Sequence, residues 1–218
     1  MRPLSLLALV ATALALSGCG SSPTTPATAA GPWTQEQLNE HASNFEMKKG
    51  ENKKPGELPL SFVDVSGKPV DLATYRGKKN VVLVVVKGMP KDPGGAFCPG
   101  CLAQVNSLTA NYPEFQKRNA EIVMVFPGPQ DVLPKFLRDG LVAADDGKSK
   151  VPFPLVADSD LKAVKSLGID GDWARPSTYI LNTSGDVVFA YVGPPRTTHD
   201  RPSVKALLDQ LDKLAQSN

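Results

Sequence analysis

The sequence predicts a three-layer α/β sandwich in which helices flank one central mixed sheet, with a hairpin added at the N-terminal side. Two continuous apolar runs, 80–87 and 121–126, have the composition of strands buried on both faces. Segments with apolar residues three and four positions apart follow these runs and predict helices. Near the C-terminus, two further strand-like runs flank the turn Thr183-Ser184-Gly185, which predicts an antiparallel pair within the same sheet.

The first element of the folded domain is the predicted hairpin. Residues 61–65 alternate apolar and polar side chains and end at the turn Ser66-Gly67-Lys68, before a second short run at 69–72. After the strand at 80–87, residues 98–118 carry an apolar face at helical spacing, and Pro113 predicts a kink or break in that helix. The remaining expected elements are a helix at 130–138, a strand at 153–156, a helix at 158–167 capped by Asp158, strands at 178–182 and 186–192, and a helix at 203–214.

The N-terminus has the proportions of a signal peptide. Arg2 precedes an apolar run at 4–16, which is shorter than the roughly 20 residues that a membrane-spanning helix needs. The run ends in Leu16-Ser17-Gly18-Cys19, which resembles the lipobox of bacterial lipoproteins. That resemblance implies a signal peptide at 1–18 and a lipid on Cys19, and Gly20 favours the outer membrane if the source is Gram-negative. The alternative is an ordinary secretory signal with a chance cysteine.

The predicted domain boundaries follow from composition. Residues 20–32 consist of small residues and proline, which predicts a flexible tether. Thr34 and Gln37 predict a capping box that opens a short helix through Phe45, and a charged loop follows at 48–56. We therefore expect a lipid-anchored tether with a short helix at 19–56 and a folded domain at 57–218.

Overall charge excludes some function classes. The 218 residues carry a net charge of +2 and are 41% hydrophobic, as in an ordinary globular protein. One domain and a tail account for this length. Nothing in this balance indicates a nucleic-acid partner or a strongly acidic one.

Cys98 and Cys101 are the predicted chemical centre. The chain has three cysteines, so lipidation of Cys19 leaves this CxxC pair as the only thiols of the domain. The pair stands where a buried strand and its loop lead into a helix, and free N–H groups and the helix dipole there favour a thiolate. Cysteines so placed have pKa values of about 3.5 to 7.5. Pro99 suits the first helical turn. We predict that Cys98 attacks and that Cys101, one turn along, resolves.

Two other roles for the pair stay open. A structural disulfide is reasonable in an oxidising compartment, although a two-residue gap closes too short a loop to stabilise much. Half of a metal site is the other alternative, but zinc needs four ligands and the predicted domain adds only His199. His199 lies between polar residues and is interpreted as a solvated loop residue. No metal or other cofactor is therefore expected.

The CxxC segment and a later proline together resemble the thioredoxin superfamily. Phe97-Cys98-Pro99-Gly100-Cys101 follows a Val-rich strand, and Arg175-Pro176-Ser177-Thr178-Tyr179-Ile180 comes later in the chain. The resemblance implies a cis bond before Pro176, with this proline against the active-site cysteines. It also implies that the Arg175 backbone offers its N–H and C=O to an extended substrate, in the manner of strand addition. A plain trans proline that enters a strand is the alternative.

The wider chain resembles the redoxin branch, which comprises the alkyl hydroperoxide reductase and thiol-specific antioxidant family and related envelope thioredoxin-like lipoproteins. Segments 56–62, 72–78 and 151–158 support the resemblance, which covers about residues 56–215.

Two features depart from the peroxiredoxin pattern. Gly95 stands where peroxiredoxins have a Thr or Ser, and Pro176 stands where they have an Arg. The loop at 88–97 is also longer than the thioredoxin loop and lacks its Trp. Lys91 and Asp92 in this loop are interpreted as solvated, and Lys87 is the expected electrostatic neighbour of Cys98.

These features predict a thiol-disulfide oxidoreductase of the cell envelope. Its expected partners are the thiols and disulfides of envelope proteins and a redox partner protein, and the lipid attaches it to the membrane. A peroxiredoxin-type thiol peroxidase is the second hypothesis. A copper-binding chaperone module is the third, but such modules resemble CxxxC with a histidine before the late strand, and residues 173–176 contain none.

Overall fold

The computed structural model describes residues 33–59, 61–89, 96–142 and 150–216. The predicted signal peptide, Cys19 and the tether at 20–32 lie outside the described residues, as do Lys91, Asp92 and Gly95. In the described ranges, none of the helices has both the length and the apolar character that crossing a bilayer requires.

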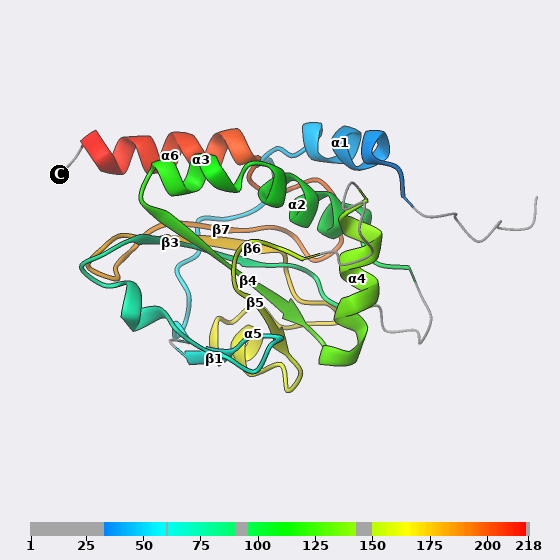
Figure 1. The fold of residues 1–218 in the computed structure, drawn as a ribbon, viewed down its shortest axis with the longest axis horizontal. Helices are drawn as coiled ribbons and strands as arrows, with labels where there is room; N and C mark the ends of the chain where they lie inside the picture. The colour runs from blue at the N-terminus through cyan, green and yellow to red at the C-terminus, as the bar shows by residue number, and fades with distance from the viewer. Residues whose placement is uncertain (1–32, 60, 90–95, 143–149, 217–218) are drawn as a thin grey trace, which may run out of the picture. The chain divides into compact units, whose positions relative to one another are not determined.

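One mixed five-stranded sheet forms the centre of the fold, in the order β5-β4-β3-β6-β7 (Figure 1). Parallel pairing joins β3 to β4 and β4 to β5, whereas β6 runs antiparallel to both β3 and β7. A separate antiparallel pair, β1 with β2, confirms the predicted hairpin. The strand bounds are β1 Ser61–Val63, β2 Pro69–Asp71, β3 Asn80–Val85, β4 Ala120–Pro127, β5 Leu155–Asp158, β6 Ser177–Leu181 and β7 Val187–Val192.

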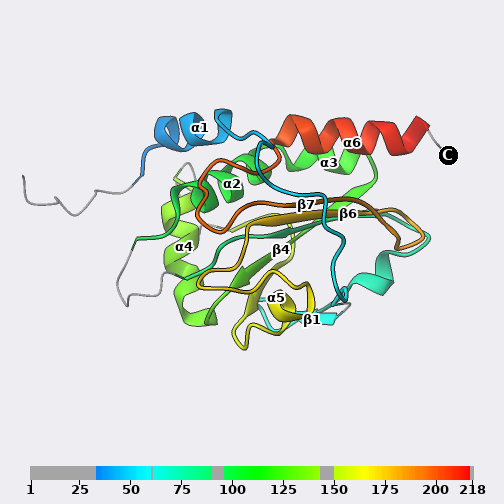
Figure 2. The same cartoon turned by 180° about the vertical axis from the view of Figure 1, so that it is seen from behind.

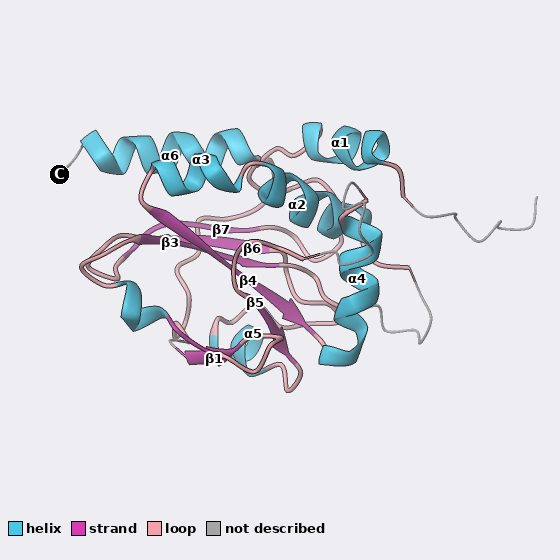
Figure 3. Cartoon of the chain, viewed as in Figure 1, coloured by secondary structure: helices cyan, strands magenta, loops and turns pink. Residues whose placement is uncertain are grey.

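Helices cover both faces of this sheet, as the predicted sandwich requires. Four of them, α1, α2, α3 and α6, lie along one face, and α5 and the β1–β2 pair lie on the other (Figures 1 and 2). The helix bounds are α1 Gln35–Ser43, α2 Pro99–Ala110, α3 Tyr112–Lys117, α4 Leu133–Gly140, α5 Lys162–Ser166 and α6 Val204–Gln216, with short 3₁₀ helices η1 Leu72–Tyr75 and η2 Gln130–Val132. Figure 3 shows the layers by secondary structure.

Alternation along the central strands divides the core in two. Val82 and Val84 of β3 pack in one cluster with α1, α2, α4 and α6, whereas Leu83 and Val85 pack in the other with β1 and α5. Successive side chains of a strand point to opposite faces, so a strand covered on both sides must be apolar throughout. This explains why the run at 80–87 shows no polar alternation.

Two local predictions about the helices are confirmed. The helix expected at 98–118 breaks at Asn111, and Pro113 lies in the first turn of α3, where its missing N–H leaves no intrahelical bond unmade. The Asp158 carboxylate accepts hydrogen bonds from the backbone N–H groups of Ala163 (3.1 Å) and Val164 (3.0 Å). Asp158 thus caps α5 as predicted, but it ends β5, and the helix begins at Lys162 with Leu161 as its N-cap residue, not at 158.

The structure differs from the predicted start of the domain near residue 57. The expected capping box is present, since Gln37 N–H donates to the Thr34 hydroxyl at 3.2 Å and Thr34 N–H donates to the Gln37 side chain at 2.9 Å. The helix it opens is not part of a tether. Leu38 is fully buried in the core cluster beside α2, and Phe45 is buried in the same cluster. Residues 33–51, here called the N-terminal arm, belong to the folded unit.

Candidate active site

Cys98 and Cys101 lie at the start of α2, as predicted. Cys98 is the N-cap residue and Pro99 occupies the first turn. Both side chains are thiols, with Cys98 half-buried and Cys101 buried. The backbone N–H of Lys87, just beyond β3, donates to the Cys101 sulfur at 3.4 Å. The two sulfurs therefore differ in access, and Cys98 is the one a partner can reach.

The two thiols differ in acidity as well. A hydrogen bond from Cys101 lowers the pKa of Cys98 to about 5, and the positive charges of Arg201 and Lys87 act in the same direction against the effect of burial. Burial, the hydrogen bond with Cys98 and the Cys98 charge raise the pKa of Cys101 well above its ordinary value. This asymmetry supports Cys98 as the attacking thiolate and Cys101 as the resolving thiol. It also agrees with Lys87 as a neighbour of Cys98.

Arg201 is the residue beside the cysteines that sequence reasoning missed. Its side chain is only 1% exposed. Nη1 donates to the carbonyl of Gly100 (3.1 Å) and to the Gln104 side-chain oxygen (2.8 Å), and it lies 3.9 Å from the Cys101 sulfur. The guanidinium also lies 5.3 Å from the centre of the Phe45 ring, which the N-terminal arm supplies. Arg201 lies in the loop after β7, 100 positions after Cys101 in the chain. No local sequence motif could therefore associate it with the CxxC pair.

Both tryptophans of the chain lie near Cys98. Trp33 from the arm and Trp173 from the segment before β6 line a cavity of about 300 Å³ together with Cys98. Its other lining residues are Lys87, Ala96, Phe97, Pro99 and Thr198. The sequence lacks a tryptophan directly before the first cysteine, but the fold brings indole rings to the thiol from two distant segments.

The two histidines of the chain form a pair next to this cavity. His41 Nδ1 and His199 Nε2 are 2.7 Å apart, and their rings are stacked. His199 lies in a loop and is only half-buried, as expected, but it is not simply solvated, because α1 of the arm packs His41 onto it. Within the described ranges, no three or more His, Cys, Asp or Glu side chains are grouped to hold a metal ion.

A family model described as the AhpC/TSA family matches residues 38–190, which is more than half of the chain. The chain belongs to the AhpC/TSA family. The match begins inside α1, which agrees with the arm being part of the folded unit. This match confirms the resemblance to the redoxin branch, and the mixed sheet between two layers of helices confirms the predicted fold class.

The relatives of this AhpC/TSA chain include proteins with two kinds of name, peroxiredoxin Q and thiol-disulfide oxidoreductase. A chloroplastic peroxiredoxin Q of Sedum lineare is 29% identical over 137 residues, which cover 61% of this chain and 64% of the relative. The thiol-disulfide oxidoreductase ResA of Halalkalibacterium halodurans is 26% identical over 142 residues, which cover 63% of this chain and 68% of the relative. The family and these relatives support an oxidoreductase enzyme.

Solved structures agree on the fold. A peroxiredoxin Q of Xanthomonas campestris matches with a TM-score of 0.52 at 22% identity and covers 77% of this chain and 99% of that one. A mitochondrial 1-Cys peroxiredoxin of yeast matches with a TM-score of 0.60 at 18% identity and covers 77% of this chain and 78% of that one.

The structure of this AhpC/TSA chain contradicts the cis bond expected before Pro176 and occupies part of the expected substrate edge at Arg175. No described peptide bond is cis, so Pro176 is a trans proline entering β6. The Arg175 N–H donates to the Ile169 carbonyl at 2.9 Å, and the Arg175 carbonyl accepts from the Ser177 hydroxyl at 2.9 Å. The Arg175 N–H is therefore used within the chain, whereas its carbonyl oxygen keeps a second lone pair, and substrate binding at Arg175 and Pro176 stays a prediction.

The Arg175 side chain is also committed elsewhere. Its Nε donates to the Gly193 carbonyl at 3.0 Å, and its Nη1 pairs with the Glu51 carboxylate of the arm at 2.7 Å. The end of β7 and the arm therefore hold this guanidinium. Arg201, not Arg175, is the arginine next to the cysteines.

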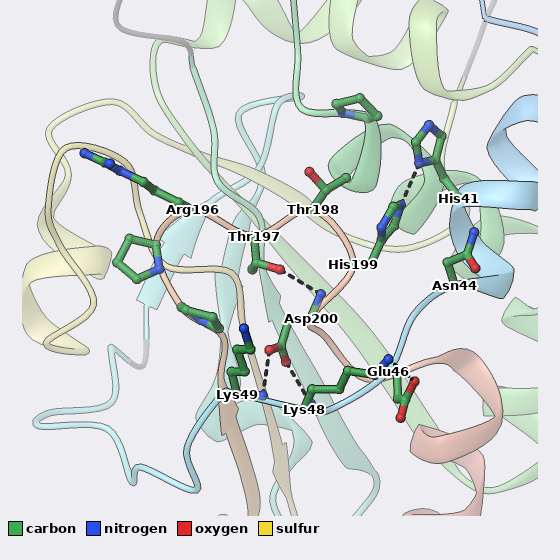
Figure 4. A pocket seen from close by; sticks show the side chains of 13 residues that line it. His41, Asn44, Glu46, Lys48, Lys49, Arg196, Thr197, Thr198, His199 and Asp200 are labelled. Atoms are coloured by element: carbon green, nitrogen blue, oxygen red, sulfur yellow. Dashed lines mark hydrogen bonds and ion pairs between the residues drawn. The ribbon is translucent and has the colours of Figure 1, made fainter.

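A larger cleft of about 1140 Å³ opens between the arm and the loop after β7 (Figure 4). Pro99 lines it, so the cleft borders the CxxC segment. His41 and His199 point toward each other in one wall, whereas Lys48, Lys49 and Arg196 come from its other parts. Its charged lining comprises Lys48, Lys49 and Arg196 against Glu46 and Asp200.

Proposed function

We propose that this chain is a thiol-disulfide oxidoreductase of the cell envelope that uses Cys98 and Cys101 as its redox pair. The observation that carries the proposal is the asymmetry of the pair. An accessible sulfur with a strongly lowered pKa stands at the start of a helix, and a buried protonated thiol stands one turn behind it. Disulfide exchange requires this difference, because one sulfur must attack the partner disulfide first and the other must attack only after the mixed disulfide has formed.

In the reducing direction the Cys98 thiolate attacks one sulfur of a partner disulfide. A Cys98–partner disulfide forms, and the other partner sulfur leaves as a thiolate that takes a proton. Cys101 then loses its proton and attacks Cys98, which forms the Cys98–Cys101 disulfide and releases the second partner thiol. Two electrons pass to the partner, and the oxidising direction is the reverse.

A peroxiredoxin-type peroxidase is the second candidate, because peroxiredoxin Q proteins are among the relatives. Peroxide reduction needs donors that stabilise charge on the leaving hydroxide beside an accessible thiolate. Pro176 supplies no such donor. The Arg201 guanidinium is buried: its Nη1 points to Gly100, Gln104 and Cys101, and its Nε and Nη2 are shielded from solvent. The geometry at the cysteines therefore favours disulfide exchange over peroxide reduction.

Rapid mixing separates the two activities. The reduced chain, without residues 1–18 and with Cys19→Ser, is mixed in parallel with hydrogen peroxide and with a protein disulfide such as that of insulin. We expect the disulfide to be reduced far faster than peroxide is consumed, and Cys98→Ser to abolish the disulfide reaction. Saturating oxidation of Cys98 at micromolar peroxide would instead establish the peroxidase.

Location and partners are part of the same proposal. The signal-like segment and the Leu16-Ser17-Gly18-Cys19 sequence support an envelope protein anchored by lipid on Cys19, with envelope proteins as its disulfide partners. Intact-mass analysis of the mature protein tests the anchor, and Cys19→Ala is the control. A mature chain with an unmodified Cys19 thiol, or with another N-terminus, contradicts it.

A further inference from the structure

Arg201 is a buried cation without an anionic side chain to balance it. No carboxylate of the described residues forms an ion pair with it, and its Nε and Nη2 atoms have no hydrogen-bond partner. An arginine this deeply buried is normally paired, because a lone charge in a low-dielectric interior is strongly unfavourable. The ionisable groups that face it at the CxxC are the two cysteine sulfurs.

Burial disfavours the thiolate form of Cys101, so this form needs stabilisation from neighbouring groups. Burial holds the Cys101 thiol in its protonated form, yet the thiolate is the form that attacks a mixed disulfide. The two N–H groups directed at its sulfur, from Lys87 at 3.4 Å and from Arg201 at 3.9 Å, both stabilise the thiolate. Arg201 is the one of these that also carries a full charge.

The charge on Arg201 has a different counter-ion at each stage of the exchange. In the reduced protein, Arg201 and the Cys98 thiolate attract each other. Once Cys98 is bonded to a partner sulfur it is neutral, so Cys101 is the remaining group at the pair that can supply a negative charge. At that stage Cys98 also stops opposing ionisation of Cys101, because its own charge is gone.

We propose that Arg201 is a catalytic residue of the resolving step, in which its guanidinium stabilises the Cys101 thiolate that attacks the mixed disulfide at Cys98. This inference rests on the proposed disulfide exchange. Cys101 gives its proton to solvent or to the departing partner thiolate, its sulfur bonds to Cys98, and the bond between Cys98 and the partner breaks. No redox reagent other than the partner disulfide is needed.

The fold places this guanidinium tightly. Gly100 and Gln104 of α2 accept its hydrogen bonds, and Phe45 of the arm covers it. Arg201 lies outside residues 38–190, the range that the family model matches. The site therefore combines the CxxC segment, which the family model covers, with an arginine from the loop before α6, which it does not cover.

An aromatic disulfide reagent, 5,5′-dithiobis(2-nitrobenzoic acid), resolves the two steps. With the Cys19→Ser chain, attack by Cys98 releases one coloured thiolate, and attack by Cys101 releases a second. We expect Arg201→Gln to slow the second release by about tenfold, with a smaller effect on the first, because the lost thiolate is only partly offset by the higher nucleophilicity of a more basic sulfur. Mass spectrometry should then show the adduct on Cys98, and the second release should need a higher pH.

Two further variants make the result specific. Lys205→Gln removes one positive charge from exposed α6 and should leave both releases unchanged. Arg201→Lys keeps the charge and should slow the second release less than Arg201→Gln does. Where Arg201→Gln does not fold, Arg201→Lys carries the test and should slow the second release more than the first. Equal slowing of both releases in either folded variant, or an unchanged second release in folded Arg201→Gln, overturns the inference. A single release from the unsubstituted pair contradicts the proposed function instead.

Discussion

The carbonyl oxygen of Thr198 occupies the space that a side chain on Gly100 would need. A Cβ added at Gly100 would overlap this oxygen and would come within 3.0 Å of the Arg201 guanidinium. The glycine of the CxxC segment thus allows the loop after β7 to lie directly on the start of α2. This close approach brings Arg201 and His199 to the cysteines.

Gly100→Ala should therefore push the loop away and lower stability. Forcing a methyl group against a backbone oxygen costs about 1 to 3 kcal/mol, because a backbone atom cannot turn aside as a side chain can. Thermal unfolding of the reduced variant measures the loss. Gly171→Ala is the matched control, since its nearest neighbour, the Trp173 carbonyl, is at an ordinary 3.4 Å. Equal stability of the two variants would show that the approach is not tight.

Alkylation of Cys98 should follow a titration with its midpoint near pH 5. The thiolate is the reactive form, and its pKa is lowered to about 5 by the hydrogen bond from Cys101 first and then by the nearby positive charges. Iodoacetamide labelling followed by peptide mass mapping measures this profile. Cys101→Ala removes the hydrogen bond and should move the midpoint to higher pH. A midpoint near the ordinary cysteine value of about 8.5 contradicts the assignment.

Most of the fold could be predicted because its signals are local. The Val-rich run of β3, the turn at 183–185 and the break near Pro113 each depend on neighbouring residues, and all three are confirmed. The capping box at Thr34 is also a local signal, and it is confirmed as well. The packing of α1 against the core could not be predicted, because its segment is polar and Leu38 and Phe45 are too few apolar residues to reveal a buried face.

The residues of the site also divide into those with a local sequence signal and those without one. Cys98 and Cys101 share one motif, so sequence reasoning placed them correctly at the start of α2. Arg201 and the His41–His199 pair depend on contacts between segments 100 and 158 positions apart, which no spacing rule reveals. Pro176 shows the opposite error, since a familiar sequence pattern implied a cis bond that the described backbone does not have.

Asp200→Asn should loosen the N-terminal arm. The Asp200 carboxylate accepts the backbone N–H groups of Lys48 (3.1 Å) and Lys49 (2.7 Å) and the Tyr191 hydroxyl. An amide accepts with only one oxygen, so at least one of these donors, two of which are part-buried, loses its partner, at a cost of about 1 kcal/mol. Hydrogen exchange at residues 33–51 should rise. Asp209→Asn, which breaks only an exposed pair with Lys205, should leave that exchange unchanged.

The same carboxylate gives the arm a pH dependence. Burial opposes ionisation of Asp200, but the Tyr191 bond and the backbone N–H groups outweigh it and lower its pKa. A lowered acid pKa contributes stability above the unfolded value of about 3.9, and that stability is lost as the pH falls toward the folded value. The protection factor of amides in the arm, which corrects for the intrinsic slowing of exchange in acid, should therefore fall on acidification below about pH 4 in the unsubstituted chain, and Asp200→Asn should remove this dependence.

His199 should report the redox state of Cys98. Burial, His41 and Arg201 lower the pKa of His199, whereas the Cys98 thiolate raises it. Formation of the Cys98–Cys101 disulfide removes the thiolate charge and leaves the three lowering influences, so the pKa of His199 should be lower in the oxidised protein than in the reduced one. Since the chain has two histidines, proton NMR of the imidazole C–H signals can follow each, with His41→Gln to assign them.

The coupling between these groups must be reciprocal. If the thiolate favours a protonated His199, then protonation of His199 favours the thiolate, and hence the reduced pair, by the same free energy. The reduction potential should therefore rise more steeply with falling pH where His199 titrates, and His199→Asn should remove that component. Cys98→Ser provides the control for the titration, because oxidant should then leave the His199 pKa unchanged. Identical His199 titrations in the reduced and oxidised protein would show that the histidine pair does not sense the Cys98 charge.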